Sequence, residues 1–351
     1  MVTESIIKQQ DFESIAKAEL NWKKLEGKTI LITGATGYVP QYIIHGIMKH
    51  NDIYGSKIMV IALCRSAVKA EMRFFDYFGR DDFVLLIQDI FEEVNYSDNI
   101  DFIIHAASPA GVINSNKDPL TTFNVNVEGS KRFLELAEKK KADFLLFSSV
   151  DIYGKSENGS RFTEDYSGAL DSLDPRNVYS CAKRASETLC MCYAVRGINA
   201  KIVRPTQIMA DGIPLDDGRL HIDFISQIKA GNKIVLKGDG SPIRSFIYIT
   251  DAITGVLTVL TAGESGQAYN ICNEDAEASV LEFAKVMASH VADKVKISYD
   301  MEIRNHDPAV KHAVSVVTAS SAKLQSLGWK PFVSLDESCR RMMISYGINV
   351  R

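Results

Sequence analysis

Short apolar runs alternate with longer amphipathic stretches along the first two hundred residues of the chain. Most runs are five to eight residues long and rich in Ile, Leu, Val and Phe, as buried strands are. They occupy residues 29–33, 58–63, 85–90, 101–108 and 144–149. Stretches such as 126–140 and 179–196 have apolar positions three and four residues apart, which is typical of helices. Strands alternating with helices predict an α/β fold around a doubly wound parallel sheet.

The first apolar run leads directly into a glycine-rich loop. Residues 34–40 read Gly-Ala-Thr-Gly-Tyr-Val-Pro. Such glycines let backbone amides approach a pyrophosphate at the start of the next helix. Pro40 stands where a third glycine is usual, and the first turn of a helix tolerates proline because its missing amide hydrogen has no partner there. The loop predicts a Rossmann-type dinucleotide site, although a glycine turn in another kind of α/β protein gives the same pattern.

The end of the second run bears on the choice between NAD and NADP. A carboxylate usually follows this strand and holds the adenosine ribose hydroxyls. Here Arg65 stands near the strand end, and a guanidinium suits a 2′-phosphate, which favours NADP. Arginine also stacks on adenine, so NAD and NADP both stay open as cofactors.

A tyrosine and a lysine stand four residues apart in the stretch 179–196. At this spacing Tyr179 and Lys183 share one face of a helix, about one turn apart. A fixed ammonium, together with an oxidised nicotinamide, favours the phenolate, so we expect a lowered pKa for Tyr179 and a role as a base. Alone, the pair is compatible with an ordinary surface helix.

Four ordered motifs together resemble the extended short-chain dehydrogenase/reductase superfamily, or NAD-dependent epimerase/dehydratase family, whose members modify nucleotide sugars. The motifs are the loop at Gly34, His105-Ala106-Ala107, residues 148–154, and Tyr179 with Lys183. The resemblance covers residues 28 to about 346. Segments 105–110, 215–219 and 244–249 are most similar to the UDP-glucuronate decarboxylase (UDP-xylose synthase) subgroup.

The resemblance implies catalytic roles for four side chains. Tyr179 is the expected base for the sugar 4-hydroxyl, Ser149 the partner of the same oxygen, and Lys183 the holder of the cofactor ribose. Asp151 stands where the subgroup has a glutamate and keeps a carboxylate near the sugar, although a loop aspartate bonded to its own backbone is an equal alternative. Val150 replaces the acid of the 4,6-dehydratases, which disfavours dehydration.

The resemblance also implies binding residues. For the cofactor they are Gly34, Thr36, Gly37, Tyr38, Val39, Arg65, Asp89, Ile90, Ala106, Ala107, Ser108, Asn126 and Lys183. For the substrate they are Pro109, Gln207, Arg219 and Arg244, with the arginines on phosphates because a guanidinium fork matches phosphate oxygens. Gln207 replaces the asparagine of the family's Arg-x-x-Asn pattern, and Lys311-His312 lies near the place of a missing phosphate-binding arginine. No metal site is expected.

These expectations divide the chain and rank its functions. Residues 1–27 are an N-terminal extension, 28–204 the dinucleotide-binding domain, and 205–351 mainly a smaller α/β substrate-binding lobe with segments crossing back. The favoured reaction is UDP-glucuronate decarboxylation through transient C4 oxidation. The alternatives are a nucleotide-sugar 4-epimerase, then an NADPH-dependent 4-keto-sugar reductase. A cofactor-sensing binding protein is the non-enzyme alternative.

Composition bears on the protein's partners and compartment. The chain has 351 residues, 46% of them hydrophobic, and a net charge of −4, so a basic nucleic-acid face is not indicated. The six scattered cysteines suit reduced thiols, and no signal peptide or membrane span is evident, which predicts a cytoplasmic protein. By resemblance, the helices at 126–140 and 179–196 would pair in the four-helix bundle of a homodimer. Their apolar stripes are equally compatible with core packing.

Overall fold

The computed structural model describes residues 6–109, 117–154, 156, 159–300 and 316–351, and within them a parallel sheet of seven strands forms the centre of the fold. The strand order is β10-β6-β5-β4-β1-β2-β3. The strands are β1 Thr29–Thr33, β2 Met59–Cys64, β3 Phe83–Ile87, β4 Phe102–His105, β5 Asp143–Phe147, β6 Ala200–Pro205 and β10 Gln267–Ile271. The predicted α/β fold with a Rossmann-type sheet is confirmed.

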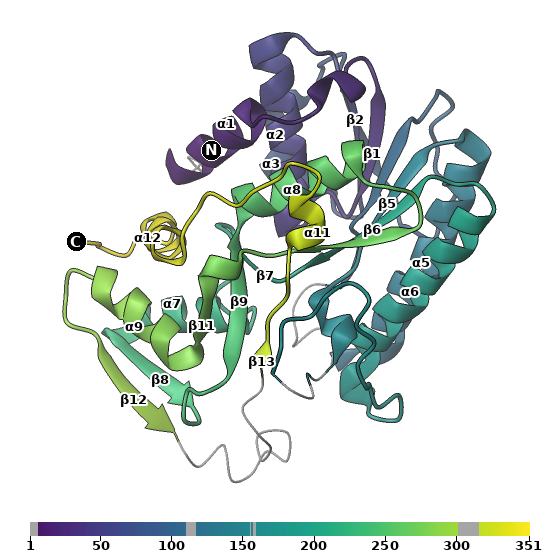
Figure 1. Ribbon diagram of the computed structural model, residues 1–351. Coiled ribbons are helices and arrows are strands. Elements are labelled where there is room, and N and C mark those ends of the chain that lie inside the picture. Colours follow the sequence, from purple (N-terminus) through teal and green to yellow (C-terminus); the bar gives the residue numbers. More distant parts are fainter. Residues whose placement is uncertain (1–5, 110–116, 155, 157–158, 301–315) are drawn as a thin grey trace.

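Helices cover both faces of this sheet (Figure 1). On one face, α2 (Tyr38–Tyr54) and α8 (Ile249–Ala262) share a core with Ile30, Ile32 and Val60. On the other, α5 (Pro119–Lys140) and α6 (Val178–Val195) pack on each other and over Leu31 and Ile103. Both sides of each strand are therefore apolar, as parallel sheets require. The short helix α3 (Ala67–Phe74) follows β2.

A second, smaller lobe is built mainly from residues after Pro205. Strand β9 (Ile243–Tyr248) pairs with β7 (Gln207–Met209), β11 (Glu277–Ser279) and β13 (Val316–Val317). Strands β8 (Lys233–Lys237) and β12 (Lys296–Asp300) form a pair, and α7 (Leu220–Gly231) and α9 (Val280–His290) lie beside them. A capping box of Ser279 and Glu282 begins α9. This lobe places β7 and β9 next to the Rossmann domain.

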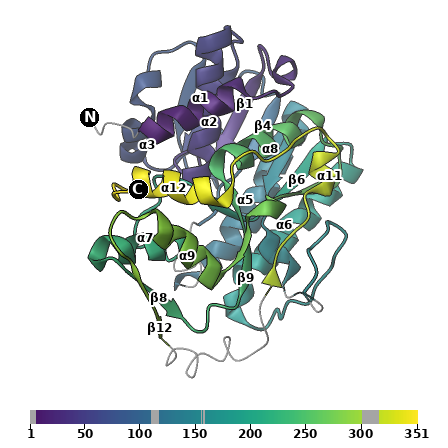
Figure 2. The same ribbon diagram turned by 60° about the vertical axis from the view of Figure 1, so that its left-hand side comes forward.

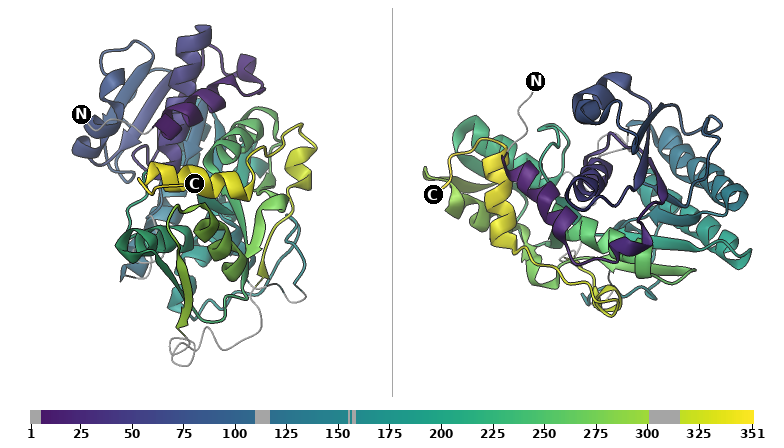
Figure 3. Two further views of the ribbon diagram at one scale, coloured as in Figure 1. Left: turned by 90° about the vertical axis from the view of Figure 1, so that its left-hand side faces the viewer. Right: turned by 90° about the horizontal axis from the view of Figure 1, so that it is seen from above.

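Both ends of the chain lie against the same region (Figures 2 and 3). The first helix, α1 (Ile6–Lys17), contacts α2, α8 and α12 (Leu335–Ser345). The four-residue helix α11 (Ala322–Gln325) covers β10, and 3-10 turns lie at Trp22–Lys24, Phe75–Tyr77, Val150–Tyr153, Pro175–Asn177 and Glu274–Ala276. None of the helices in the described ranges is both long and apolar enough to span a bilayer.

Candidate active site

The carboxyl ends of β1, β4 and β5 gather most of the predicted site residues at one edge of the sheet. Gly34 follows β1, Ala106 follows β4, and Ser149 follows β5, while β1 and β5 are the two strands that flank β4. Ligands of open α/β sheets bind at this edge. The topology thus joins motifs that lie more than a hundred residues apart.

Close packing shapes the glycine loop. Gly34 has φ 66°, and a Cβ there would lie 2.9 Å from the Cα of Ala107. The hydroxyl oxygen of Thr33 accepts hydrogen bonds from the amides of Ala106 and Ala107, both at 3.1 Å, and lies 3.0 Å from Nδ1 of His105. The ends of β1 and β4 are therefore locked together, and only glycine fits between them.

The loop leaves groups directed at a ligand. Gly37 caps α2 without a side-chain hydrogen bond, so the first amides of this helix are suited to an anion. Tyr38 and Val39 begin α2. Buried atoms without a hydrogen-bond partner among the described residues include Oγ of Ser108 and Oδ1 of Asn126. These features fit a dinucleotide whose hydroxyl and amide groups would satisfy them.

Two arginines stand at the expected adenosine end. Arg65 follows β2 with 73% of its side chain exposed and lies 3.9 Å from Asp89, which follows β3 as Ile90 does. Arg73, from α3, donates to the carbonyl oxygens of Thr36 and Gly37 in the loop. The role of Arg73 was missed, because nothing in the sequence marks a helix side chain that returns to a loop 36 or 37 residues earlier.

Lys183, Tyr179 and Ser149 lie near one another where α6 passes the end of β5. Lys183 is buried and its Nζ donates to the carbonyl of Phe147 at 2.7 Å, which ties α6 to the end of β5. The same Nζ lies 5.7 Å from the Tyr179 ring centroid. Ser149 lies close enough to Tyr179 to lower the pKa of its phenol, and the Oγ of Ser149 accepts the amide of Asp151 at 3.1 Å. The arrangement places a phenol, a hydroxyl and an ammonium around one point.

The pKa of Tyr179 in the chain by itself is set mainly by burial. Burial, followed by the charge of Asp151, raises the pKa of the phenol above its usual value, whereas the Ser149 hydrogen bond lowers it. Burial lowers the pKa of Lys183 to about 8. The protein's own side chains thus favour the neutral phenol, and the lowering expected with an oxidised nicotinamide bound stays a prediction. A cation brought by a ligand is needed to form the phenolate.

Asp151 faces the second lobe from the turn Val150–Tyr153. Its side chain is accessible to solvent, yet protein surrounds it closely enough that desolvation raises the pKa of its carboxyl. Ser149 and the charge of Arg244 on β9 oppose that shift. Asp151 is therefore a carboxyl group between Tyr179 and a cation of the substrate-binding lobe, and not only a turn residue.

The other substrate candidates approach from the second lobe. Gln207 begins β7, and its Oε1 is buried without a hydrogen-bond partner among the described residues. Arg219 precedes α7, pairs with Asp217 at 2.9 Å, and lies 4.6 Å from the ring centroid of Tyr38. Pro109 follows β4, whereas Lys311 and His312 lie outside the described residues. The charge of Arg219 reaches Tyr179, so this arginine borders the site of the predicted base.

A buried network lies behind the site. Arg204 donates to both oxygens of Glu187, at 3.0 and 2.7 Å, and to the Tyr153 hydroxyl at 2.8 Å. Arg204 is thus fully engaged within the protein and is unsuited to a substrate phosphate. Sequence reasoning missed Glu187, although its place one turn after Lys183 is a signal that a helical pattern contains.

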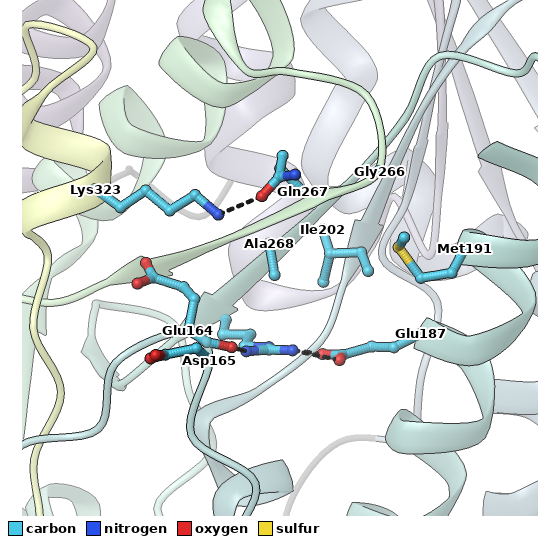
Figure 4. A pocket seen from close by; sticks show the side chains of 10 residues that line it. Glu164, Asp165, Glu187, Met191, Ile202, Gly266, Gln267, Ala268 and Lys323 are labelled. Atoms are coloured by element: carbon cyan, nitrogen blue, oxygen red, sulfur yellow. Dashed lines mark hydrogen bonds and ion pairs between the residues drawn. The ribbon is translucent and has the colours of Figure 1, made fainter. Parts of the chain in front are cut away.

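A pocket of about 260 Å³ borders this network (Figure 4). Glu164 and Lys323 line it, and both are engaged: Glu164 accepts the Asn270 amide at 2.8 Å, and Lys323 donates to Gln267 at 2.7 Å. The carboxylate of Glu164 and the ammonium of Lys323 thus already have partners within the protein. No group of three or more metal-ligating side chains occurs in the described part of the chain.

Comparison with known proteins agrees with this geometry. The model of the NAD dependent epimerase/dehydratase family matches residues 30–272. UDP-glucuronic acid decarboxylase 1 of Danio rerio is 30% identical over 315 residues, 90% of this chain and 71% of the relative. UDP-glucuronic acid decarboxylase 2 of Arabidopsis thaliana is 27% identical over 91% of this chain and 68% of its own length. The structure of UDP-glucuronic acid 4-epimerase from Bacillus cereus, in complex with UDP-glucuronic acid and NAD, has a TM-score of 0.72 at 22% identity and covers 91% and 99% of the two chains.

Proposed function

Because the chain belongs to the NAD dependent epimerase/dehydratase family, we propose that it binds NAD or NADP and modifies a nucleotide sugar through transient oxidation at C4. We propose UDP-glucuronate decarboxylation as the reaction. The observation that carries this proposal is the meeting of Ser149, Tyr179 and Lys183 with the carboxyl group of Asp151. The names of the two relatives support the choice of substrate.

The first step is oxidation of the sugar 4-hydroxyl. Tyr179 takes the hydroxyl proton, Ser149 hydrogen-bonds the same oxygen, and Lys183 holds the ribose and supplies a positive charge beside the phenol. The nicotinamide, when bound, supplies the hydride acceptor and later returns the hydride to C4. A cofactor-sensing protein has no need for such a proton-transfer set.

The second step is loss of the carboxylate as carbon dioxide. Oxidation at C4 makes a β-keto acid, so the electron pair of the C5–C6 bond passes to the C4 carbonyl and leaves an enolate. Asp151 is the carboxyl group next to Tyr179, and its raised pKa suits it to give a proton to C5. The proton that Tyr179 took from the 4-hydroxyl returns to O4 when C4 is reduced. The net change is one proton taken up and one carbon dioxide released.

Two related reactions use the same first step. A 4-epimerase would turn the keto sugar and reduce its other face. A keto-sugar reductase would consume NADPH, which the position of Arg65 favours. The carboxyl of Asp151 has no task in either reaction, and this places decarboxylation first.

Mass spectrometry of UDP-glucuronate incubated with the protein and NAD or NADP tests the proposal. We expect the nucleotide sugar to lose the mass of carbon dioxide with wild-type protein and to stay unchanged with Tyr179→Phe. An unchanged mass with the wild type would contradict decarboxylation. Chromatography of the same sample then distinguishes an epimer from unreacted substrate.

We also propose that two copies pair through α5 and α6. These helices expose large apolar side chains: Leu120, Phe123, Met191 and Val195, with Leu120 76% and Val195 87% exposed. Light scattering should give twice the chain mass of 38.9 kDa for the wild type and a lower mass for Val195→Glu. A wild-type mass of one chain would contradict the proposal.

A further inference from the structure

The N-terminal helix α1 precedes the residues that match the family, and its buried side reaches both lobes. It lies beside α2, α8 and α12 (Figure 3). Toward α2, Phe12 stacks on His45 with ring centroids 4.3 Å apart. Ile15 packs so closely on Gly46 that a Cβ added at Gly46 would clash with Cγ2 of Ile15. Helix α1 is therefore fixed to α2, the helix that begins at the glycine loop.

Asp11 is the one charged side chain on the buried side of α1. Its Oδ2 accepts the Tyr248 hydroxyl at 2.8 Å, and its Oδ1 accepts Nη1 of Arg341 at 2.6 Å. Arg341 also donates to Glu337 at 3.0 Å within α12. We call Asp11, Tyr248 and Arg341 the Asp11 clamp. The clamp joins α1, β9 and α12, and a buried carboxylate of this kind is retained only when it is well paired.

The clamp lies at the end of the strands that carry two substrate candidates. Tyr248 is the last residue of β9, which begins one residue before Arg244. In the strand register, Tyr248 is opposite Met209, the last residue of β7, and β7 begins at Gln207. A shift of Tyr248 therefore moves both strands relative to the Rossmann domain, where Asp151 and Tyr179 lie.

We propose that Asp11 is a positioning residue: through Tyr248 it holds β7 and β9, and with them Gln207 and Arg244, in register with the catalytic side chains for nucleotide-sugar binding. Only the identity of the ligand rests on the proposed function. The mechanical coupling between α1 and the substrate lobe does not.

The charge of Asp11 gives the clamp a pH dependence. The charged or titratable groups around it are Tyr42 on α2, Tyr248 on β9, Asp211 after β7, and Arg341 with Glu337 on α12. The carboxyl of Asp251 on α8 accepts the amides of Phe332 and Val333 instead. Burial raises the pKa of Asp11 to about 7, while Tyr248 and Arg341 oppose the shift. Asp11 is therefore mainly charged at about pH 8 and mainly protonated at about pH 6.

Hydrogen exchange of the full chain, followed by mass spectrometry, tests the coupling without any substrate. At about pH 8, Asp11→Asn should exchange faster in β7 and β9 and equally in β1 and β2. At about pH 6 the difference from the wild type should shrink, because a protonated carboxyl resembles the amide. Tyr248→Phe removes only the hydroxyl and should also speed exchange in β9. Glu13→Gln, on the exposed side of α1 where Glu13 pairs with Lys17 at 2.6 Å, should change neither sheet.

Unchanged exchange in β7 and β9 would overturn the proposal, and so would an equal increase in β1 and β2, which marks a general loss of stability. Calorimetric titration with UDP at about pH 8 measures ligand binding. Asp11→Asn should lower the affinity for UDP by roughly three- to tenfold and leave the affinity for NADH unchanged. Equal UDP affinities would also overturn the proposal. If the wild type fails to convert UDP-glucuronate, the proposed reaction is wrong, while the exchange result still decides the role of Asp11.

Discussion

Glu187 lies one helical turn after Lys183 on α6, and its carboxylate opposes the effect of burial on this lysine. Burial lowers the pKa of Lys183 to about 8, and the negative charge of Glu187 limits the shift. The carboxylate is itself held by Arg204 through two hydrogen bonds. The charge on Lys183 is therefore supported by an ion pair that is buried within the protein. This relationship explains how a buried lysine stays charged near neutral pH.

Replacing Glu187 with glutamine should move the alkaline limb of kcat/KM to lower pH. Lys183 acts as an ammonium, and activity falls as pH rises through its pKa, so removing the carboxylate makes the fall begin earlier. Leaving Arg204 without its partner should also cost about 3–5 kcal/mol in the free energy of unfolding. Initial rates across pH and thermal unfolding measure the two effects.

The matched control for this change is Glu138→Gln. Glu138 forms an ion pair with Arg196 at 2.7 Å, but both side chains are partly exposed, so little stability depends on the pair. The pH profile of this variant should match the wild type. A profile of Glu187→Gln that also matches the wild type would show that Lys183 does not depend on Glu187.

Tyr179→Phe should lower kcat by about 10²- to 10⁴-fold, because the phenol is the proposed base and the ring itself is kept. Cofactor affinity should change little, since Lys183 and the glycine loop are untouched. Tyr299→Phe is the control, because Tyr299 lies on β12 with 51% of its surface exposed. Turnover that survives unchanged in Tyr179→Phe would contradict catalysis by this tyrosine and favour the cofactor-sensing alternative.

Asp151→Asn should separate oxidation from decarboxylation. The charge of Asp151 raises the pKa of Tyr179, so its removal should move the acidic limb of C4 oxidation to lower pH. Carbon dioxide release should fall, because the amide cannot give a proton to C5. Asp151→Glu should keep decarboxylation, since it restores the residue that the subgroup resemblance implies.

Carbon dioxide release and reduced-cofactor absorbance, followed together across pH, measure both effects of Asp151→Asn. Asp165→Asn is the control, because Asp165 lies at the separate pocket in Figure 4. Equal carbon dioxide release in Asp151→Asn and the wild type would leave Asp151 without a catalytic task.

The strands, the glycine loop and the Tyr179–Lys183 pair could be predicted because their signals are local. A strand followed by glycines predicts a dinucleotide loop, and a spacing of four residues on a helix brings two side chains to one face. The sheet order then follows from the fold class. The expected runs agree with β1 and β2 to within one residue, whereas the runs 85–90 and 101–108 extend three residues beyond the ends of β3 and β4.

The remaining contacts could not be predicted because they join distant segments. The Thr33 hydroxyl meets amides 73 and 74 residues later, and the Asp11 carboxylate meets a hydroxyl 237 residues later. Neither contact has a local pattern. In the chain by itself the pKa of Tyr179 is raised, because burial, which a motif does not report, exceeds the effects that stabilise the phenolate.

Arg65 and Arg73 should have separable effects on cofactor binding. Arg65 is exposed and lies 3.9 Å from Asp89, so it is placed to meet a 2′-phosphate, whereas Arg73 is engaged by the loop carbonyls of Thr36 and Gly37. Loss of a charge-assisted hydrogen bond costs about 1.5–3 kcal/mol, or roughly 10- to 100-fold in affinity. We expect Arg65→Ala to weaken NADPH binding by this amount and NADH binding much less.

Arg73→Met should weaken the binding of both cofactors, because Arg73 supports the loop that both use. Replacement of the exposed Lys69 with alanine should weaken the binding of neither. Fluorescence titration with NADH and with NADPH gives the dissociation constants of each variant and of the wild type. Equal losses of NADH and NADPH affinity in Arg65→Ala would mean that Arg65 stacks on adenine and that the preference for NADP is wrong.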